Sequence, residues 1–247
     1  MPVSTPRTEP AAPPFEPAGA SGVIPPLENG QPLTRAEFER RYDAMPHVKK
    51  AELIEGVVHV PSPVRYRQHG SPHSTLVGWL FLYRARTPGT RLADNASVRL
   101  DLVNMPQPDA TLFIDPEFGG QASIDPDDYL SGGPDLVAEV SASSVAQDSG
   151  EKRRAYERNH VREYIIWRVL DRQVDWYILR GESYEKQTPG DDGILRSAAF
   201  PGLWLDPSAL IRDDCDVVLE VLARGLETPE HAAFVAQLEA ARTRPTA

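Results

Sequence analysis

The chain has 247 residues, of which 40% are hydrophobic and 25% charged, a composition typical of a globular protein with a buried core. Its formal net charge of −10 argues against a protein that coats nucleic acid non-specifically, because phosphate binding needs a cationic surface. The single cysteine, Cys215, excludes an intrachain disulfide, and no apolar run reaches the roughly 18 residues of a membrane helix. We therefore expect a cytoplasmic protein that does not bind membranes.

The N-terminal part of the chain divides into a tail and the start of a domain. Nine of the 24 prolines lie between Pro2 and Pro32, so we expect residues 1–31 to be a disordered tail. A capping box of Thr34 and Glu37 predicts a helix over residues 35–44. Further predicted elements are a hairpin (51–54 and 57–60) around Glu55-Gly56, and a helix from Ser71 to about residue 87 that presents Leu76, Trp79, Leu80 and Tyr83 on one face.

The rest of the chain alternates between strands and helices. We predict strands over 97–101, 109–114 and 135–141, then a helix from Asp148 to about residue 159, capped by Asp148 and Glu151. A second hairpin (163–169 and 173–179), short strands near 184–187 and 196–200, and a helix over 232–241 follow. This order predicts an α/β or α+β fold with one central mixed sheet flanked by helices. The expected domain spans residues 32–225, followed by a C-terminal helix and tail over 226–247.

Two carboxylates stand in strands that are otherwise apolar. Asp109 begins the strand 109–114, and Glu139 lies in the middle of the strand 135–141, on the face opposite Leu136, Ala138 and Val140. An unpaired carboxylate in a central strand is costly, and two on adjacent strands repel each other unless a cation lies between them. A hard divalent cation with oxygen ligands meets that need.

A lysine and a third carboxylate complete the predicted site. Lys152 lies one turn into the helix that follows the Glu139 strand, where it could orient an attacking water or stabilise charge on a phosphate. Glu52, in the first hairpin, is a fourth candidate; Glu55 competes with it but has the character of a turn residue. Metal, carboxylates and lysine together indicate phosphodiester hydrolysis.

Each signal also has a structural explanation. Glu139 alone could form a buried salt bridge, and Lys152 alone could lie on a solvated helix face, because other basic residues surround it. His69 and His73 are expected to straddle a helix start, so they predict no zinc site. The basic stretch from Glu151 to Arg172 could line a groove that guides a polyanion, with additions from Lys49, Lys50, Arg65 and Arg67.

An ordered series of motifs resembles the Uma-type restriction endonuclease family, within the PD-(D/E)XK nuclease superfamily. It spans about residues 33–210 and consists of Glu52-Leu53-Ile54-Glu55-Gly56, Ser62-Pro63, His69, Gln107-Pro108-Asp109, Pro134-Asp135-Leu136-Val137-Ala138-Glu139-Val140-Ser141, Gly150-Glu151-Lys152-Arg153 with Tyr156, Glu163-Tyr164-Ile165-Ile166-Trp167, and Pro201-Gly202-Leu203.

The resemblance implies a restriction-endonuclease-like core with a magnesium-type site. Asp109 would match the Asp of the first motif and Glu139 the acidic residue of the second, while Ser141 stands where the superfamily's usual lysine would be. Lys152 matches a lysine that has moved to the next helix, and Glu52 matches an early acidic position. The implied activity is DNA cleavage, with Mg²⁺ or Mn²⁺ held by Asp109, Glu139 and Glu52. A protein that cuts both strands is expected to be a homodimer. Two alternatives are a catalytically silent binding or regulatory module, and a metal-dependent hydrolase of a small phosphoester.

Overall fold

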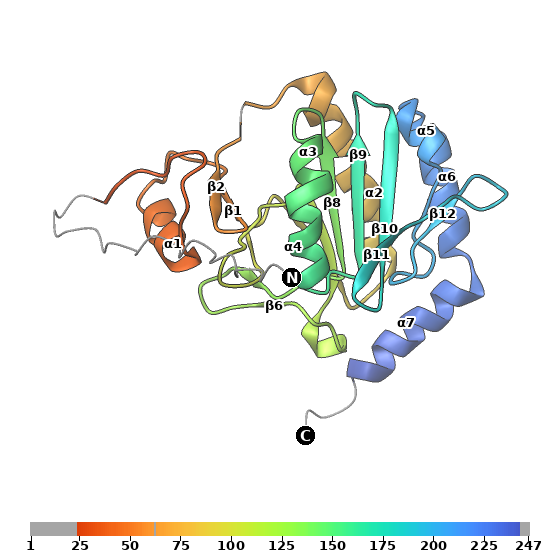
Figure 1. Ribbon diagram of the computed structural model, residues 1–247. Coiled ribbons are helices and arrows are strands. Elements are labelled where there is room, and N and C mark those ends of the chain that lie inside the picture. The colour runs from red at the N-terminus through yellow and green to blue at the C-terminus, as the bar shows by residue number, and fades with distance from the viewer. Residues whose placement is uncertain (1–23, 62, 243–247) are drawn as a thin grey trace, which may run out of the picture.

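The computed structural model describes residues 24–61 and 63–242. Its centre is a six-stranded sheet in the order β11-β10-β9-β8-β5-β3 (Figure 1). Only the β8–β9 pair is parallel and the other neighbours are antiparallel, so the predicted mixed sheet is confirmed. The strands are β3 (Thr90–Asp94), β5 (Ala110–Ile114), β8 (Leu136–Ser141), β9 (Glu163–Arg168), β10 (Gln173–Arg180) and β11 (Ser183–Lys186).

Helices cover both faces of this sheet (Figure 1). On one face α2 (Ser71–Arg86) packs with α5 (Pro207–Ile211), α6 (Cys215–Leu226) and α7 (Pro229–Arg242) around the largest core cluster. Trp79 of α2 meets Trp176 of β10 edge to face, with ring centroids 6.0 Å apart. All four apolar residues predicted on one face of this helix are buried.

The opposite face carries a helical segment with three parts. It runs from α3 (Val145–Gln147) through a π-helical turn, η3 (Asp148–Lys152), into α4 (Arg153–Arg158). Tyr156 of α4 packs there against Tyr164 of β9 in a separate core cluster. The predicted helix start was wrong: the helix begins before Asp148, and no side-chain cap forms at Asp148 because that side chain is buried.

The N-terminal elements form a small layer beside the sheet (Figure 1). Helix α1 (Arg35–Asp43) and the hairpin β1 (Glu52–Ile54) and β2 (Val57–His59) are present as predicted, and Thr34 caps α1. The Glu37 carboxylate does not complete the capping box, because it pairs with Arg40 and Arg41 at 2.7 and 2.6 Å. Of the expected disordered tail, residues 1–23 lie outside the described part of the chain. Leu27 is buried, so packing begins before residue 32.

Several elements differ from the predicted ones. The strand expected over 97–101 is only β4 (Val98–Arg99), in a small sheet with β6 (Ser123–Ile124) and β7 (Leu130–Ser131). The strand expected near 184–187 is β11. Of the strand expected near 196–200 only the end of the two-residue β12 (Leu195–Arg196) is present, paired with β13 (Trp204–Leu205), which was not predicted. Helix α6 was not predicted, and it crosses the expected domain boundary at 225/226 while packing against α2. Among the described residues, no helix has the length and apolarity needed to cross a membrane.

Candidate functional site

The four predicted site residues converge from four separate elements. Glu52 belongs to β1, Asp109 directly precedes β5, Glu139 is in the middle of β8, and Lys152 ends the π-helical turn η3. All four are buried, with relative exposures between 2% and 4%. The four residues that the sequence predicted as one site are therefore neighbours. Glu55, the competing candidate, instead occupies the turn between β1 and β2 with a positive φ of 50°.

Lys152 is the centre of a buried charge cluster. Its Nζ lies 2.9 Å from Glu52 Oε1, 2.9 Å from Glu139 Oε1 and 3.6 Å from Asp148 Oδ1. Burial would lower the pKa of this lysine, but the surrounding carboxylates outweigh that effect and raise its pKa well above the ordinary value. The explanation of Lys152 as a solvated surface residue is therefore wrong.

Glu139 lies between the cationic Lys152 and the anionic Asp109. Burial, together with the nearby Asp109 carboxylate, raises the pKa of Glu139 to about 8, although Lys152 acts in the opposite direction. Its Oε1 also accepts a hydrogen bond from the Tyr156 hydroxyl at 3.1 Å. Tyr156 holds this carboxylate from the helix side, while β8 holds it from the sheet side.

Asp109 has a different set of partners. Its carboxylate lies 3.2 Å from Lys50 Nζ and 3.1 Å from His69 Nε2, and it accepts a hydrogen bond from the Val140 backbone N–H at 2.8 Å. Burial opposes its ionisation, but the His69 hydrogen bond and the Lys50 charge outweigh burial and hold the pKa of Asp109 well below its usual range. The backbone N–H of Asp109 lies 3.4 Å from Glu139 Oε2. Each of the two carboxylates therefore accepts a hydrogen bond from the backbone of the neighbouring segment, Asp109 from Val140 and Glu139 from Asp109.

Both histidines lie at this site, which sequence analysis did not anticipate. A π-helical turn, η1 (Tyr66–Gly70), runs directly into α2 and brings the two imidazole rings to 5.4 Å between centroids. His73 Nε2 lies 3.0 Å from the Asp94 carboxylate and 3.1 Å from the Asp109 carbonyl oxygen. The two histidines flank the start of α2 at Ser71, as expected, but the helical turn before α2 brings their rings together, which the sequence did not predict.

Asp148 and Lys50 were also not assigned to the site from sequence. Asp148 was expected to cap a helix, but it is buried beside Lys152 and accepts a 2.6 Å hydrogen bond from Ser144. Lys50 was named only as an addition to a basic patch. Its side chain is 25% exposed, so it is more accessible from solvent than Lys152, whose side chain is 4% exposed.

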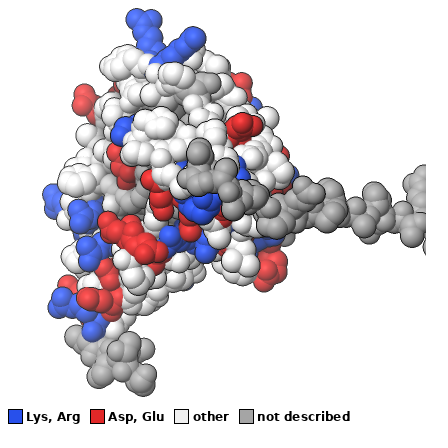
Figure 2. Space-filling view, turned by 90° about the vertical axis from the view of Figure 1, so that its left-hand side faces the viewer, with Lys and Arg blue, Asp and Glu red and all other residues white. Residues whose placement is uncertain are grey.

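The predicted basic groove is largely neutralised by acidic partners. Glu55 binds Arg154 at 3.1 Å and Arg158 at 3.0 Å. Arg162 lies 3.2 Å from Asp135, and Arg168 contacts Asp171 and Asp175. Figure 2 shows basic and acidic side chains intermixed over the face that carries α1 and the β1–β2 hairpin. With Lys152 included, five of the seven basic residues between Glu151 and Arg172 are paired with carboxylates of the described chain, so most of the positive charge of this stretch is compensated.

The donor chemistry of the site fits a hard divalent cation. Asp109 and Glu139 are neighbouring buried carboxylates, and Glu52, which shares Lys152 with Glu139, adds a third oxygen donor. Over residues 24–61 and 63–242, no group of three or more His, Cys, Asp or Glu side chains is already arranged to hold a metal ion. Lys50 and His69 bind the Asp109 carboxylate and Lys152 binds that of Glu139, so a metal would have to replace some of these contacts.

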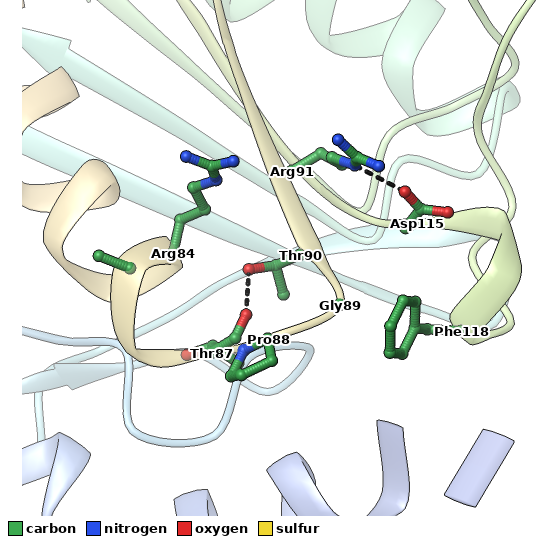
Figure 3. A pocket seen from close by; sticks show the side chains of 9 residues that line it. Arg84, Thr87, Pro88, Gly89, Thr90, Arg91, Asp115 and Phe118 are labelled. Carbon is green, nitrogen blue, oxygen red and sulfur yellow. Dashed lines mark hydrogen bonds and ion pairs between the residues drawn. The ribbon is translucent and has the colours of Figure 1, made fainter. Parts of the chain in front are cut away.

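A separate cavity of about 400 Å³ lies at the other end of β3 (Figure 3). Its lining includes Thr90, at the start of β3, whereas the site lies near Asp94, at the end of that strand. Within the cavity Arg91 is bound to Asp115 at 2.6 Å, and the Arg84 side chain points into the space without a marked interaction. This cavity contains none of the four predicted site residues.

Comparisons with known proteins agree with this architecture. The model of the Uma2 family, described as "Putative restriction endonuclease", matches residues 35–208. A solved structure from Anabaena variabilis ATCC 29413, described as "a putative nuclease belonging to DUF820", matches with a TM-score of 0.50 and 16% identity, covering 73% of this chain and 98% of that one. No match was found among curated proteins.

The fold and the family match define a protein of the restriction-endonuclease-like class, as the motif series predicted. Within that class, the chain belongs to the Uma2 family.

Proposed function

We propose that this protein is a metal-dependent endonuclease that hydrolyses phosphodiester bonds of DNA. The observation that carries the proposal is the pair of buried carboxylates, Asp109 directly before β5 and Glu139 in the neighbouring strand β8, with Lys152 bound to Glu139 at 2.9 Å. Two buried carboxylates side by side repel each other, and a hard divalent cation bound between them would relieve that repulsion. Membership of a nuclease-like family supports the choice of a phosphodiester substrate.

In this proposal Asp109 and Glu139, assisted by Glu52, would hold Mg²⁺ or Mn²⁺. A bound divalent cation would supply Lewis acidity toward a phosphate oxygen and a lowered pKa for a coordinated water. Lys152 keeps Glu139 and Glu52 oriented toward each other, and its positive charge stabilises negative charge that develops at the phosphate. Lys50 and His69, which bind Asp109 and are partly exposed, would contact the substrate phosphate.

Cleavage of supercoiled plasmid tests this assignment. The protein is incubated with Mg²⁺, Mn²⁺ or a chelator, beside Asp109→Asn, Lys152→Ala and the matched surface control Lys186→Ala. We expect nicking that requires metal, that both site variants lose and that the control retains. Nicking that survives Asp109→Asn would exclude this site. Conversion of nicked to linear plasmid would show double-strand cutting, the activity that would call for a homodimer.

A catalytically silent nuclease-fold module is the second candidate. It is favoured by a specific observation: protein cations already compensate Asp109 and Glu139, so folding itself does not require a metal. Such a module would show neither nicking nor metal-dependent stabilisation against heat. Stabilisation by Mn²⁺ without nicking of any DNA would favour hydrolysis of a small phosphoester.

A further inference from the structure

An exposed segment leads directly into the site. Val64 and Arg65 directly precede the π-helical turn η1, and Tyr66 and Arg67 are its first two residues. The apolar side chains of this segment face solvent: Val64 is 70% exposed and Tyr66 is 77% exposed. At this exposure the Tyr66 ring packs little against the fold and is accessible to a partner. His69, which binds Asp109 at 3.1 Å, follows Tyr66 by three residues.

The two arginines of this segment differ from most arginines near the site. Arg65 and Arg67 are exposed, and their side chains form no hydrogen bond or ion pair with any residue the structure describes. Arg154 and Arg158, by contrast, are both bound to Glu55. On a chain with a net charge of −10, uncompensated cations beside a cluster of carboxylates point to an anionic partner.

The backbone of the turn ties this segment to the site. The His69 backbone N–H donates to the Arg65 carbonyl oxygen at 2.9 Å, and Arg65 itself is extended and directly precedes η1. Arg65 is therefore one hydrogen-bonded turn away from His69, which binds Asp109. Tyr66 lies within about one helical turn of the same point.

We propose that the segment Val64–Arg67 holds a single-stranded stretch of DNA at the site, with Tyr66 stacked on a base and Arg65 and Arg67 bound to flanking phosphates. An aromatic ring stacks on a base whose face is uncovered, and in an intact duplex neighbouring base pairs cover those faces. The preferred substrate is therefore single-stranded or locally unpaired DNA. This inference rests on the proposed nuclease function and names its substrate class.

Binding can be measured apart from cleavage. The full chain carrying Asp109→Asn is titrated, in the presence of chelator, into a fluorescent single-stranded oligonucleotide and into its duplex, and Kd is read from anisotropy. We expect tighter binding of the single strand. Tyr66→Ala should weaken single-strand binding roughly 5- to 150-fold, and Tyr66→Phe should retain it, because stacking needs the ring and not the hydroxyl.

Charge is tested with two matched double variants. Arg65→Gln with Arg67→Gln should weaken binding of both oligonucleotides and reduce the slope of log K against log salt by about 1 to 2. Arg84→Gln with Arg86→Gln, the same charge change at the far end of α2, should leave Kd and slope unchanged. Circular dichroism confirms that each variant is folded.

Equal affinity for duplex and single strand, or binding that Tyr66→Ala leaves unchanged, would overturn the proposal, as would the absence of any binding. Failure of the nuclease assignment gives a different pattern. A protein that binds as expected but cleaves nothing with metal refutes the proposed function alone. A protein that cleaves DNA without any effect of Tyr66, Arg65 or Arg67 refutes only this inference.

Discussion

Replacing Lys152 with methionine tests the buried charge cluster. The substitution keeps the aliphatic stem but removes the charge that lies within 3.6 Å of Glu52, Glu139 and Asp148. Removing one partner of a buried ion pair costs about 3 to 5 kcal/mol, because it leaves the other charge buried and uncompensated. That loss would be a large fraction of the roughly 5 to 15 kcal/mol that stabilises a typical domain.

Urea unfolding at pH 8 in the presence of chelator measures this loss, with Lys50→Met as the matched control. Lys50 is partly exposed and its partner Asp109 keeps the contacts with His69 and Val140, so the control should lose only about 1.5 kcal/mol. At pH 5 the deficit of Lys152→Met should shrink, because the abandoned carboxylates take up protons. An equal loss in the two variants at pH 8 would refute the reasoning.

Three further predictions concern stability. The folded-state pKa of Glu139, about 8, lies above the ordinary 4.5, so the contribution of Glu139 to stability is complete below pH 4.5 and is lost as the pH rises to about 8. Glu139→Gln should therefore flatten the dependence of the unfolding free energy on pH over that window. An unchanged slope would contradict the raised pKa. A Cβ on Gly225 would lie 2.2 Å from the Gly202 carbonyl oxygen, whereas one on Gly78 would meet nothing within 4 Å. Thermal melting should show that Gly225→Ala destabilises the protein by more than about 1 kcal/mol, while Gly78→Ala stabilises it by up to about 1 kcal/mol, and the reverse order would contradict the described α6 packing. Glu163 accepts four hydrogen bonds in the core, so Glu163→Ala should cost about 3 kcal/mol or more in urea unfolding, and Glu163→Gln less; equal losses would indicate that packing volume, and not hydrogen bonding, decides.

The parts of the fold that sequence predicts are those governed by local periodicity. Alternation along residues 135–141 assigned Glu139 to the face opposite Leu136, and the structure places Leu136 in the α2-side core and Glu139 beside α4. The capped helix α1 and the turn at Glu55-Gly56 follow from equally local chemistry. Helix α6 was missed, although its buried residues recur at helical spacing: Val218, Val221, Leu222 and Gly225.

The parts of the site that sequence did not predict depend on tertiary packing. Lys152 is surrounded in sequence by Arg153 and Arg154, which favours a solvated face, yet the β1 hairpin brings Glu52 over it and buries it. His69 and His73 come together because η1 makes the chain helical before Pro72, and a single π-helical turn leaves no periodic pattern in the sequence. Asp148 has the sequence character of a helix cap, and only the position of the helix start shows that it faces inward.

A metal site on Asp109 and Glu139 is tested most directly by a calorimetric titration of Mn²⁺ into the purified full chain, beside Asp109→Asn. We expect saturable binding to the unsubstituted protein, with proton release because the cation ionises Glu139, and loss of that binding in Asp109→Asn, which circular dichroism in chelator should show to be folded. Undetectable binding to the unsubstituted protein, or equal binding to both, would contradict a metal site built on Asp109 and Glu139.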